Sequence, residues 1–412
     1  MWKHYTKLAL KVLWRRKVFT SISLFGIGFT LMGLLVLTAM IDNMLAPQSP
    51  ESRLARILHV SYVSLEGEQS RSNGAAGYGF LDRYVRGLPG VERMAIMTEP
   101  QDVSGFVNGE KVQSKLRYAD DEFWNVLDFD FTEGAPYGVD DEKGANQVAV
   151  ISEATRVRYF GEAKAVGRTI DVGGVSYRVV GVVRDVPFYR TSAAAHIWVP
   201  ISTNRTPYFR EQLRGEFTGL LLAGGRADFP AIRAEFASRL QRVEFPDDNY
   251  NIIRAVPMTR FQELARQVIY SPPEKPATAR VLGLITGGAL LFMLLPTINL
   301  VNINVSRIFE RSSEIGVRKA FGASSGRLVW QFVFENVVLC LVGAAIGLLG
   351  AVFLLAWLNR SGLLPHAEFG INVRVFAYGL GLAVFFGCLS GVYPAWRMAR
   401  LHPVAALRGD TR

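Results

Sequence analysis

Hydrophobic residues along this chain gather into four long runs, at residues 18–41, 281–306, 329–358 and 375–396. Each run is longer than the roughly 18 residues that an α-helix needs to cross a bilayer core of about 30 Å. The first run holds 24 uncharged residues, which exceeds the apolar core of a signal peptide. The pattern therefore predicts four transmembrane helices.

The stretch between the first two runs, residues 42–280, has the mixed pattern of a globular α+β domain. Strand-like alternation and amphipathic helical spacing follow each other twice, which predicts two β-α-β units. These elements lie at residues 57–64, 80–87 and 93–98, and again at residues 217–223, 229–243 and 250–256. The insertion between the two units contains two predicted hairpins, with turns at Asn108-Gly109 and Gly173-Gly174.

The net charge of +10 is concentrated beside the predicted membrane helices. Residues 42–280 hold 29 Lys and Arg against 31 Asp and Glu, so the large domain is slightly acidic. Basic residues are dense in residues 1–17, 307–328 and 397–412 and sparse in residues 359–374. By the positive-inside rule, both termini and the 307–328 connection are cytoplasmic and the large domain faces outward. This distribution argues against a nucleic-acid partner.

Residues 1–17 place a basic side chain at every fourth position, at Lys3, Lys7, Lys11 and Arg15. This spacing predicts an amphipathic helix that lies on the cytoplasmic lipid surface. A basic flank that only orients the first membrane helix explains the same residues equally well.

Small and polar residues interrupt the hydrophobic runs at a few positions. Pro296 predicts a kink in the second membrane helix, where Asn299 and Asn302 need partners. Both cysteines fall inside the runs, so no disulfide holds the outward domain together. Three G-x-x-x-G pairs predict close helix packing, either within the chain or in a dimer; they are Gly283/Gly287, Gly343/Gly347 and Gly387/Gly391.

No nucleotide-binding loop of the form G-x-x-x-x-G-K-[ST] occurs, and no H-E-x-x-H metal motif occurs. Residues 322–326 match the hydrolase pattern G-x-S-x-G, but the pattern predicts no strand before them. A helix stop at Gly322 and a capping Ser324 explain the match better than a nucleophile does. We therefore expect a non-catalytic chain that binds neither metal nor cofactor, so any ATP hydrolysis requires another chain.

The second connection, residues 307–328, reads as a short charged helix on the cytoplasmic side. Glu314 and Arg318 are four residues apart and can form an ion pair on one helix face. Such a helix suits the docking of a soluble motor protein, although a solvated hairpin explains the same composition.

The sequence at these residues resembles the FtsX-like permeases, of which the MacB-type exporters are the best-known branch. The family signature E-I-G-[IV]-R-[KR]-A-[LF]-G-A is matched by Glu314, Ile315, Gly316, Val317, Arg318, Lys319, Ala320, Phe321, Gly322 and Ala323. Residues 391–397 and 403–408 are similar to the family's G-x-[YF]-P-A-x-[RK] ending and P-x-x-A-L-R tail. A third likeness, to the MacB-type periplasmic core, lies at residues 148–152, 160–161, 166–167 and 180–183.

This resemblance implies a permease subunit of an ABC transporter of the type VII, mechanotransmitting class, in the bacterial inner membrane. The outward, periplasmic domain would be a porter-like fold at residues 50–98 and 217–260 with a sabre-like insertion at residues 99–216. Glu310 and residues 314–323 would dock a separate ABC ATPase, which would bind ATP and Mg²⁺. Further implied partners are a second permease chain, identical or paralogous, membrane lipid, a periplasmic adaptor and an outer-membrane duct.

The chain departs from MacB in one respect, because MacB-type exporters carry their ATPase ahead of the first membrane helix. Here 17 residues precede that helix, so we expect the ATPase to act in trans. The leading functional hypothesis is efflux of an amphipathic molecule, peptide or antibiotic. Lipoprotein release and signalling to a cell-wall hydrolase or sensor kinase are the alternatives, and the resemblance is weakest across residues 187–217.

Overall fold

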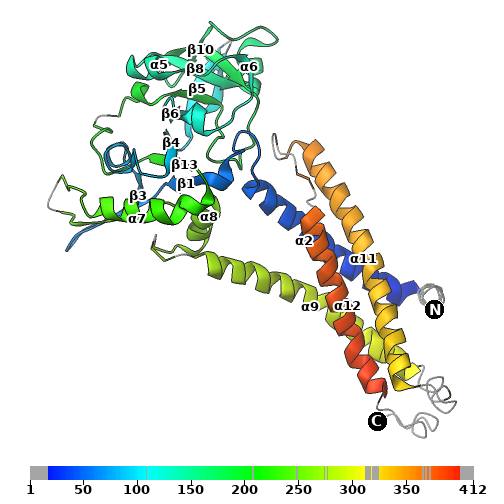
Figure 1. Cartoon of the computed structure of the whole chain (residues 1–412). Coiled ribbons are helices and arrows are strands. Elements are labelled where there is room, and N and C mark those ends of the chain that lie inside the picture. Colours follow the sequence, from blue (N-terminus) through cyan, green and yellow to red (C-terminus); the bar gives the residue numbers. More distant parts are fainter. Residues whose placement is uncertain are drawn as a thin grey trace. The chain divides into compact units, whose positions relative to one another are not determined.

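The computed structural model describes residues 17–107, 109–206, 208–246, 249–272, 274–275, 277–310, 317, 324–363, 366, 369–370 and 373–399. These residues divide into a helical unit and a β-rich unit (Figure 1). The helical unit lies within Met1–Asn43, Leu282–Leu364 and Glu368–Arg412, and the β-rich unit within Met44–Val281 and Pro365–Ala367.

Each of the four hydrophobic runs falls within one long helix. The helices are α2 (Lys17–Leu45), α9 (Thr278–Glu310), α11 (Ser325–Ser361) and α12 (Val373–Ala399). Among the described residues, three segments are long and apolar enough to cross a membrane, namely Thr20–Leu45, Thr278–Ser306 and Val329–Ser361. The apolar stretch of α12, Phe376–Val392, is shorter.

The four helices share one apolar core, to which each contributes buried side chains. These include Ile27 and Leu31 of α2, Met293 and Leu300 of α9, Leu339 and Ala344 of α11, and Ala383 and Phe386 of α12. α9 passes through Pro296, which has no N–H to donate. One turn earlier, the Met293 carbonyl accepts a hydrogen bond of 2.7 Å from the Thr297 hydroxyl, which gives this carbonyl a side-chain partner.

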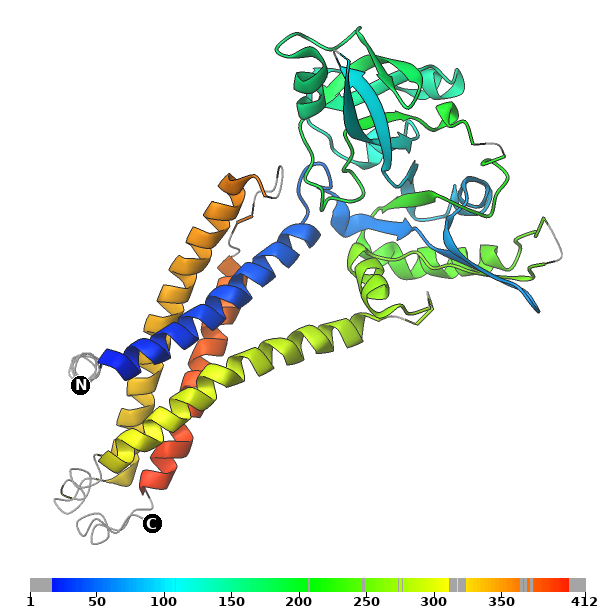
Figure 2. The same ribbon diagram turned by 180° about the vertical axis from the view of Figure 1, so that it is seen from behind.

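The β-rich unit is built on one sheet of 14 described strands (Figures 1 and 2). The main path runs β11-β8-β10-β9-β5-β6-β4-β13-β3-β2-β14, and β1 pairs with β13, β7 with β10 and β12 with β3. The strands are β1 (Ile57–Val60), β2 (Val63–Glu66), β3 (Arg71–Ala76), β4 (Val91–Thr98), β5 (Gln101–Val107), β6 (Glu110–Ala119), β7 (Phe131–Gly134), β8 (Val148–Ser152), β9 (Thr169–Val172), β10 (Val175–Val183), β11 (Ile197–Pro200), β12 (Arg214–Gly215), β13 (Phe217–Ala223) and β14 (Ile252–Arg254).

Short helices lie between these strands and after the last of them. The α-helices are α3 (Tyr78–Phe80), α4 (Phe123–Val126), α5 (Val139–Lys143), α6 (Glu153–Phe160), α7 (Phe229–Leu240) and α8 (Arg260–Ile269). The remaining helical turns are η1 (Leu54–Arg56), η2 (Leu81–Val85), η3 (Ile201–Thr203) and η4 (Arg226–Asp228), of which η2 is a π-helix.

Three large apolar clusters lie among the described residues of the β-rich unit. One joins buried residues before β5 with those after β11, and another lies within the insertion that contains β5 to β11. The third mixes both parts, because Met97 and Leu220 pack with Phe123 and Trp198 in it. Burial of apolar surface stabilises each cluster, so the shared cluster ties the insertion to the rest of the sheet.

The sequence predicted the four long helices, the elements of the two β-α-β units and two hairpins, and one strand assignment was wrong. The strand predicted at residues 57–64 is two strands, β1 and β2, because β1 pairs with β13 whereas β2 pairs with β3 and β14. Both predicted hairpins form, as β5–β6 and β9–β10. Gly173 and Gly174 both have positive φ, which suits a two-residue hairpin turn. The pattern missed β3, β7, β8, β11, β12, α4, α5, α6 and α8.

Candidate functional site

The predicted docking residues lie mostly outside the described part of the chain. α9 continues to Glu310, and Val317 is helical with 44% of its surface exposed. The residues outside the description are Glu314, Ile315, Gly316, Arg318, Lys319, Ala320, Phe321, Gly322 and Ala323. The docking assignment therefore stays a prediction.

The serine of the G-x-S-x-G match lies directly before a membrane helix. Ser324 occupies the N-cap position of α11, as expected, but its side chain makes no capping hydrogen bond. The predicted position of the serine cap is therefore confirmed, whereas a hydrogen bond from the helix backbone to its side chain is not formed.

Two of the three glycine pairs pack helices of this chain together. A Cβ atom added to Gly343 would lie 2.8 Å from Ile27, and one added to Gly347 would lie 2.7 Å from the backbone oxygen of Gly28. Both contacts bring α11 against α2. On α12, Gly387 and Gly391 approach α11 in the same way, since added Cβ atoms would lie 2.8 Å from the Cys340 Sγ and the Asn336 Nδ2.

The third pair, Gly283 and Gly287 in α9, meets nothing within 4 Å among the described residues. Its packing partner is therefore absent from the described part of this chain. The expectation of close packing within one chain holds for four of the six glycines.

A buried amide links three of the four long helices. The Asn304 Nδ2 of α9 donates to the Asn336 Oδ1 of α11 over 2.9 Å and to the backbone oxygen of Ser390 of α12 over 3.4 Å. The prediction had named Asn299 and Asn302, which are half-buried and exposed. Helical spacing from Pro296 by steps of four would have selected Asn304 instead.

In the β-rich unit, a buried ion pair fixes α8, the last described helix before α9, to β1, the first strand after α2. His59 Nδ1 of β1 lies 2.9 Å from the Glu263 Oε2 of α8, and their side chains are 2% and 6% exposed. Arg260 donates to the same oxygen over 2.7 Å. Burial would raise the pKa of Glu263, but the charges of His59 and Arg260 hold it well below its usual range.

Two further contacts strengthen this joint. The backbone groups of His59 and Met258 exchange hydrogen bonds of 2.7 and 2.9 Å. On the other face of α8, Ala265 packs with Ala277 and Val281, where α9 begins. α8 is therefore held by the strand that follows α2 and by the first turn of α9.

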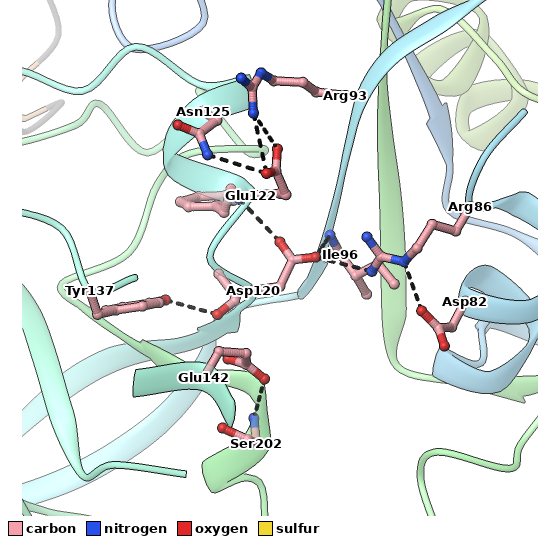
Figure 3. Close-up of polar contacts among 12 residues, drawn as sticks. Asp82, Arg86, Arg93, Ile96, Asp120, Glu122, Asn125, Tyr137, Glu142 and Ser202 are labelled. Carbon is pink, nitrogen blue, oxygen red and sulfur yellow. Dashed lines mark hydrogen bonds and ion pairs between the residues drawn. The ribbon is translucent and has the colours of Figure 1, made fainter. Parts of the chain in front are cut away.

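A second buried carboxylate lies where the insertion meets the rest of the sheet (Figure 3). Asp120, at the end of β6, accepts hydrogen bonds of 3.0 Å from the Ile96 N–H and 3.1 Å from the Phe123 N–H. Arg86, which also bonds Asp82 over 2.7 Å, lies 3.4 Å away. Burial raises the pKa of Asp120 to about 8, against the opposing effects of Arg86 and the Ile96 amide.

A cavity of about 470 Å³ is lined by residues of the insertion and by His366. The groups that line it are already engaged, since both Asp185 oxygens accept from the Ala154 N–H and His196 Nδ1 accepts from the Lys115 N–H. Burial lowers the pKa of His196, which agrees with a neutral ring. No cluster of metal-ligating side chains occurs among the residues that the structure describes. The polar side chains described in both units thus hold helices and strands in place.

Known families match the chain in two consecutive parts. Residues 20–239, more than half of the chain, match the MacB-like periplasmic core domain, and residues 287–403 match the FtsX-like permease C-terminal domain. An uncharacterized ABC transporter permease, YknZ of Bacillus subtilis, is 24% identical over 345 residues, which are 82% of this chain and 81% of YknZ.

The macrolide export ATP-binding/permease protein MacB of Chromobacterium violaceum is 30% identical over 292 residues. The match covers 69% of this chain but only 42% of that protein, so this chain spans less than half of MacB. The crystal structure of the extracellular domain of the noncanonic ABC-type transporter YknZ from Gram-positive bacteria covers 48% of this chain and 99% of that domain, at 12% identity and a TM-score of 0.37.

The apolar helices and the match to a periplasmic core domain define a membrane protein with an extracytoplasmic domain. Within that class, the chain belongs to the MacB/FtsX-like permeases of ABC transporters. The resemblance inferred from the coupling and core motifs is confirmed.

Proposed function

We propose that this chain is the permease subunit through which a separate ABC ATPase changes the conformation of an extracytoplasmic domain. The observation that carries the proposal is the order of the two family matches, a periplasmic core domain followed by the FtsX-like permease domain. ATP and Mg²⁺ are bound by the ATPase, and the conformational change drives export of an amphipathic molecule, peptide or antibiotic.

The proposed assembly contains two permease chains in the inner membrane, with a periplasmic adaptor and an outer-membrane duct. The open glycine pair of α9, Gly283 and Gly287, supports contact with a second permease chain. The domain at residues 50–98 and 217–260 acts as the porter-like base and residues 99–216 as the sabre-like insertion. Pairing of β4 with β13 supports this division, because it joins the two parts of the base.

α12 completes a set of four transmembrane helices in this proposal. Its apolar stretch is shorter than the other three. The helix nevertheless has 27 residues, and at 1.5 Å per residue it is about 40 Å long. A polar segment at either end would then lie at the lipid head groups, which suits a basic cytoplasmic tail.

Coupling to the ATPase is tested by charge reversal in the proposed docking helix. The ATPase is first identified by purifying the chain from native membranes with its bound partners. Replacing Arg318→Glu and Lys319→Glu together should weaken ATPase association by about thirtyfold, since disrupting an interface hot spot commonly costs about 2 kcal/mol. Membrane insertion should be unchanged. Ser324→Ala, next to the docking segment, is the matched control and should leave association within twofold.

Two outcomes would overturn the coupling proposal. One is unchanged ATPase association and transport in the Arg318→Glu/Lys319→Glu variant. The other is loss of function in Ser324→Ala, which would favour a catalytic serine. Co-purification of a cell-wall hydrolase or sensor kinase in place of an adaptor would replace export by signalling, and a bound lipoprotein would replace it by lipoprotein release.

A further inference from the structure

A small cavity lies beside α8, at the base of the extracytoplasmic domain. Its volume is about 180 Å³, room for roughly six water molecules and hence for a phosphate group with its ester oxygens. α8, Arg233 of α7 and the segment before α9 all contribute to its lining. The side chains that matter for its charge are Arg233, Arg266, Lys275 and Glu274.

The charge of the lining is positive. Three cationic side chains face one carboxylate, and that carboxylate, Glu274, is already paired with Arg254 over 3.2 Å. Arg233 donates to two neutral oxygens, the Pro257 carbonyl over 3.0 Å and the Gln262 side chain over 2.8 Å. Burial lowers the pKa of Arg233, and no carboxylate contributes to that shift. Among the residues that the structure describes, the cavity therefore has cationic groups without a matching anion.

One of these cationic side chains, Arg266, also has an N–H group without a hydrogen-bond acceptor in the described structure. The Arg266 Nε is buried and has no hydrogen-bond partner in the described structure. Its guanidinium stacks on the Tyr62 ring, with the Cζ 3.9 Å from the ring centroid. A buried N–H without an acceptor costs free energy comparable to a lost hydrogen bond. An anionic oxygen in the cavity would satisfy it, and guanidinium groups bind phosphate oxygens especially well.

The chain connects this cavity directly to a membrane helix. Ala277, the last residue of the lining, immediately precedes α9, whose candidate span begins at Thr278. At the end of α8, Val268 and Tyr270 are 68% and 93% exposed. An exposed tyrosine beside an aliphatic side chain is typical of the interface between lipid and water. The cavity thus belongs to a segment that reaches the level of the lipid head groups.

We propose that this cavity binds a phosphoryl group, supplied by a phospholipid head group of the outer leaflet of the membrane. The head-group phosphate is a single anion, and Arg266 and Lys275 are its principal ligands. Val256 and Met258 line the cavity as well and supply apolar contact for the glycerol carbons. The site is independent of the ATPase and of the cargo, so it stands or fails separately from the proposed transport function.

The experiment measures binding of three probes to the purified full chain in a non-ionic detergent without phosphate. The probes are dihexanoylphosphatidylglycerol, inorganic phosphate and dihexanoylglycerol, and isothermal titration gives each Kd. We expect the phospholipid to bind at least tenfold more tightly than inorganic phosphate, and dihexanoylglycerol not to bind. In Arg266→Gln/Lys275→Gln the Kd of the phospholipid should rise at least tenfold.

The control variant removes two positive charges at positions outside the cavity. Lys111→Gln/Arg178→Gln changes two exposed side chains of β6 and β10, and its Kd should stay within twofold. Lys275→Gln alone, at an exposed position, should raise the Kd about threefold and tests the site even if the double variant fails to fold.

Three results would overturn the proposal. If inorganic phosphate binds as tightly as the phospholipid, the ligand is free phosphate and no lipid is recognised. Binding of dihexanoylglycerol as tight as that of the phospholipid would show recognition of acyl chains only. A Kd unchanged in Lys275→Gln and in the double variant would place the ligand elsewhere.

Discussion

Glu263 shows at the level of a single residue how α8 is fixed to β1 within the extracytoplasmic domain. Its carboxylate is the common acceptor for His59 on β1 and Arg260 on α8. Glu263→Ala would leave both donors buried without that acceptor. Loss of one partner in a buried ion pair commonly costs about 3–5 kcal/mol, so we expect a loss of about this size in the free energy of unfolding.

Urea denaturation of the full chain, followed by near-UV circular dichroism, measures this loss. Glu244→Ala removes an exposed carboxylate and should change stability by less than about 0.5 kcal/mol. Because the pKa of Glu263 is lowered on folding, its contribution is present above the unfolded pKa and is lost as the pH falls below about 5. A Glu263→Ala variant as stable as the unchanged chain at pH 7 would contradict the assignment.

Asp120 should give the opposite dependence on pH. Its pKa is about 8 in the folded domain, above the value of about 4 for an unfolded chain. The folded state therefore holds a proton that the unfolded state lacks, and stability contributed by Asp120 falls as the pH rises from about 4 to about 8. In Asp120→Asn this dependence should disappear, with a change in slope of at most about 1.4 kcal/mol per pH unit.

The measurement is a series of urea midpoints from pH 5 to pH 8 for the two chains. Asp140→Asn, which alters an exposed carboxylate, is the control and should retain the slope. If the midpoints of Asp120→Asn and of the unchanged chain vary with pH in parallel, Asp120 has the same pKa in the folded and unfolded states.

At the scale of elements, the contact between α2 and α11 depends on the absence of side chains at Gly343 and Gly347. Gly347→Val should force the helices apart, since overpacking typically costs about 1–3 kcal/mol. Gly381→Val introduces the same side chain on α12, where the described structure leaves open space. Thermal unfolding in detergent, followed by size-exclusion chromatography, should show a lower midpoint for Gly347→Val than for Gly381→Val. Equal midpoints would contradict the packing assignment.

The sequence predicted elements whose hydrophobic residues follow one strong period better than strands that pair with several other strands. β13 begins and ends at its predicted residues, and all four apolar runs are helical. The division between β1 and β2 was missed because alternation reports which face is buried and says nothing of which strands pair. α8 was missed because its ten residues include several charged ones, although the Thr259–Gln262 capping box marks its start.

Among the candidate site residues, the sequence identified G-x-x-x-G spacings, but it did not distinguish pairs that pack within the chain from the open pair of α9. That distinction depends on which helices are neighbours. The joint at Glu263 was missed for the same reason, because His59 and Glu263 are 204 positions apart and no local pattern relates them.

At the scale of the whole molecule, the orientation in the membrane is the prediction with the widest consequence. Single cysteines at Ser72 and Ser361 should react with an impermeant thiol reagent in spheroplasts, whereas one at Ser313 should not, because basic residues keep that connection in the cytoplasm. The two native cysteines, Cys340 and Cys388, are first replaced by serine. Labelling at Ser313 with none at Ser72 would reverse the orientation.

The pairing of β4 with β13 has a consequence for how such permeases diversify. Thr98, where the chain leaves for the insertion, lies opposite Phe217, where it returns. The two ends of the insertion are thus as close as the ends of an ordinary hairpin loop, so segments of very different length can be exchanged there while the strands at the base keep their register. A lineage can acquire a new insertion, and with it a new partner, through one local recombination event that leaves the rest of the sheet unchanged.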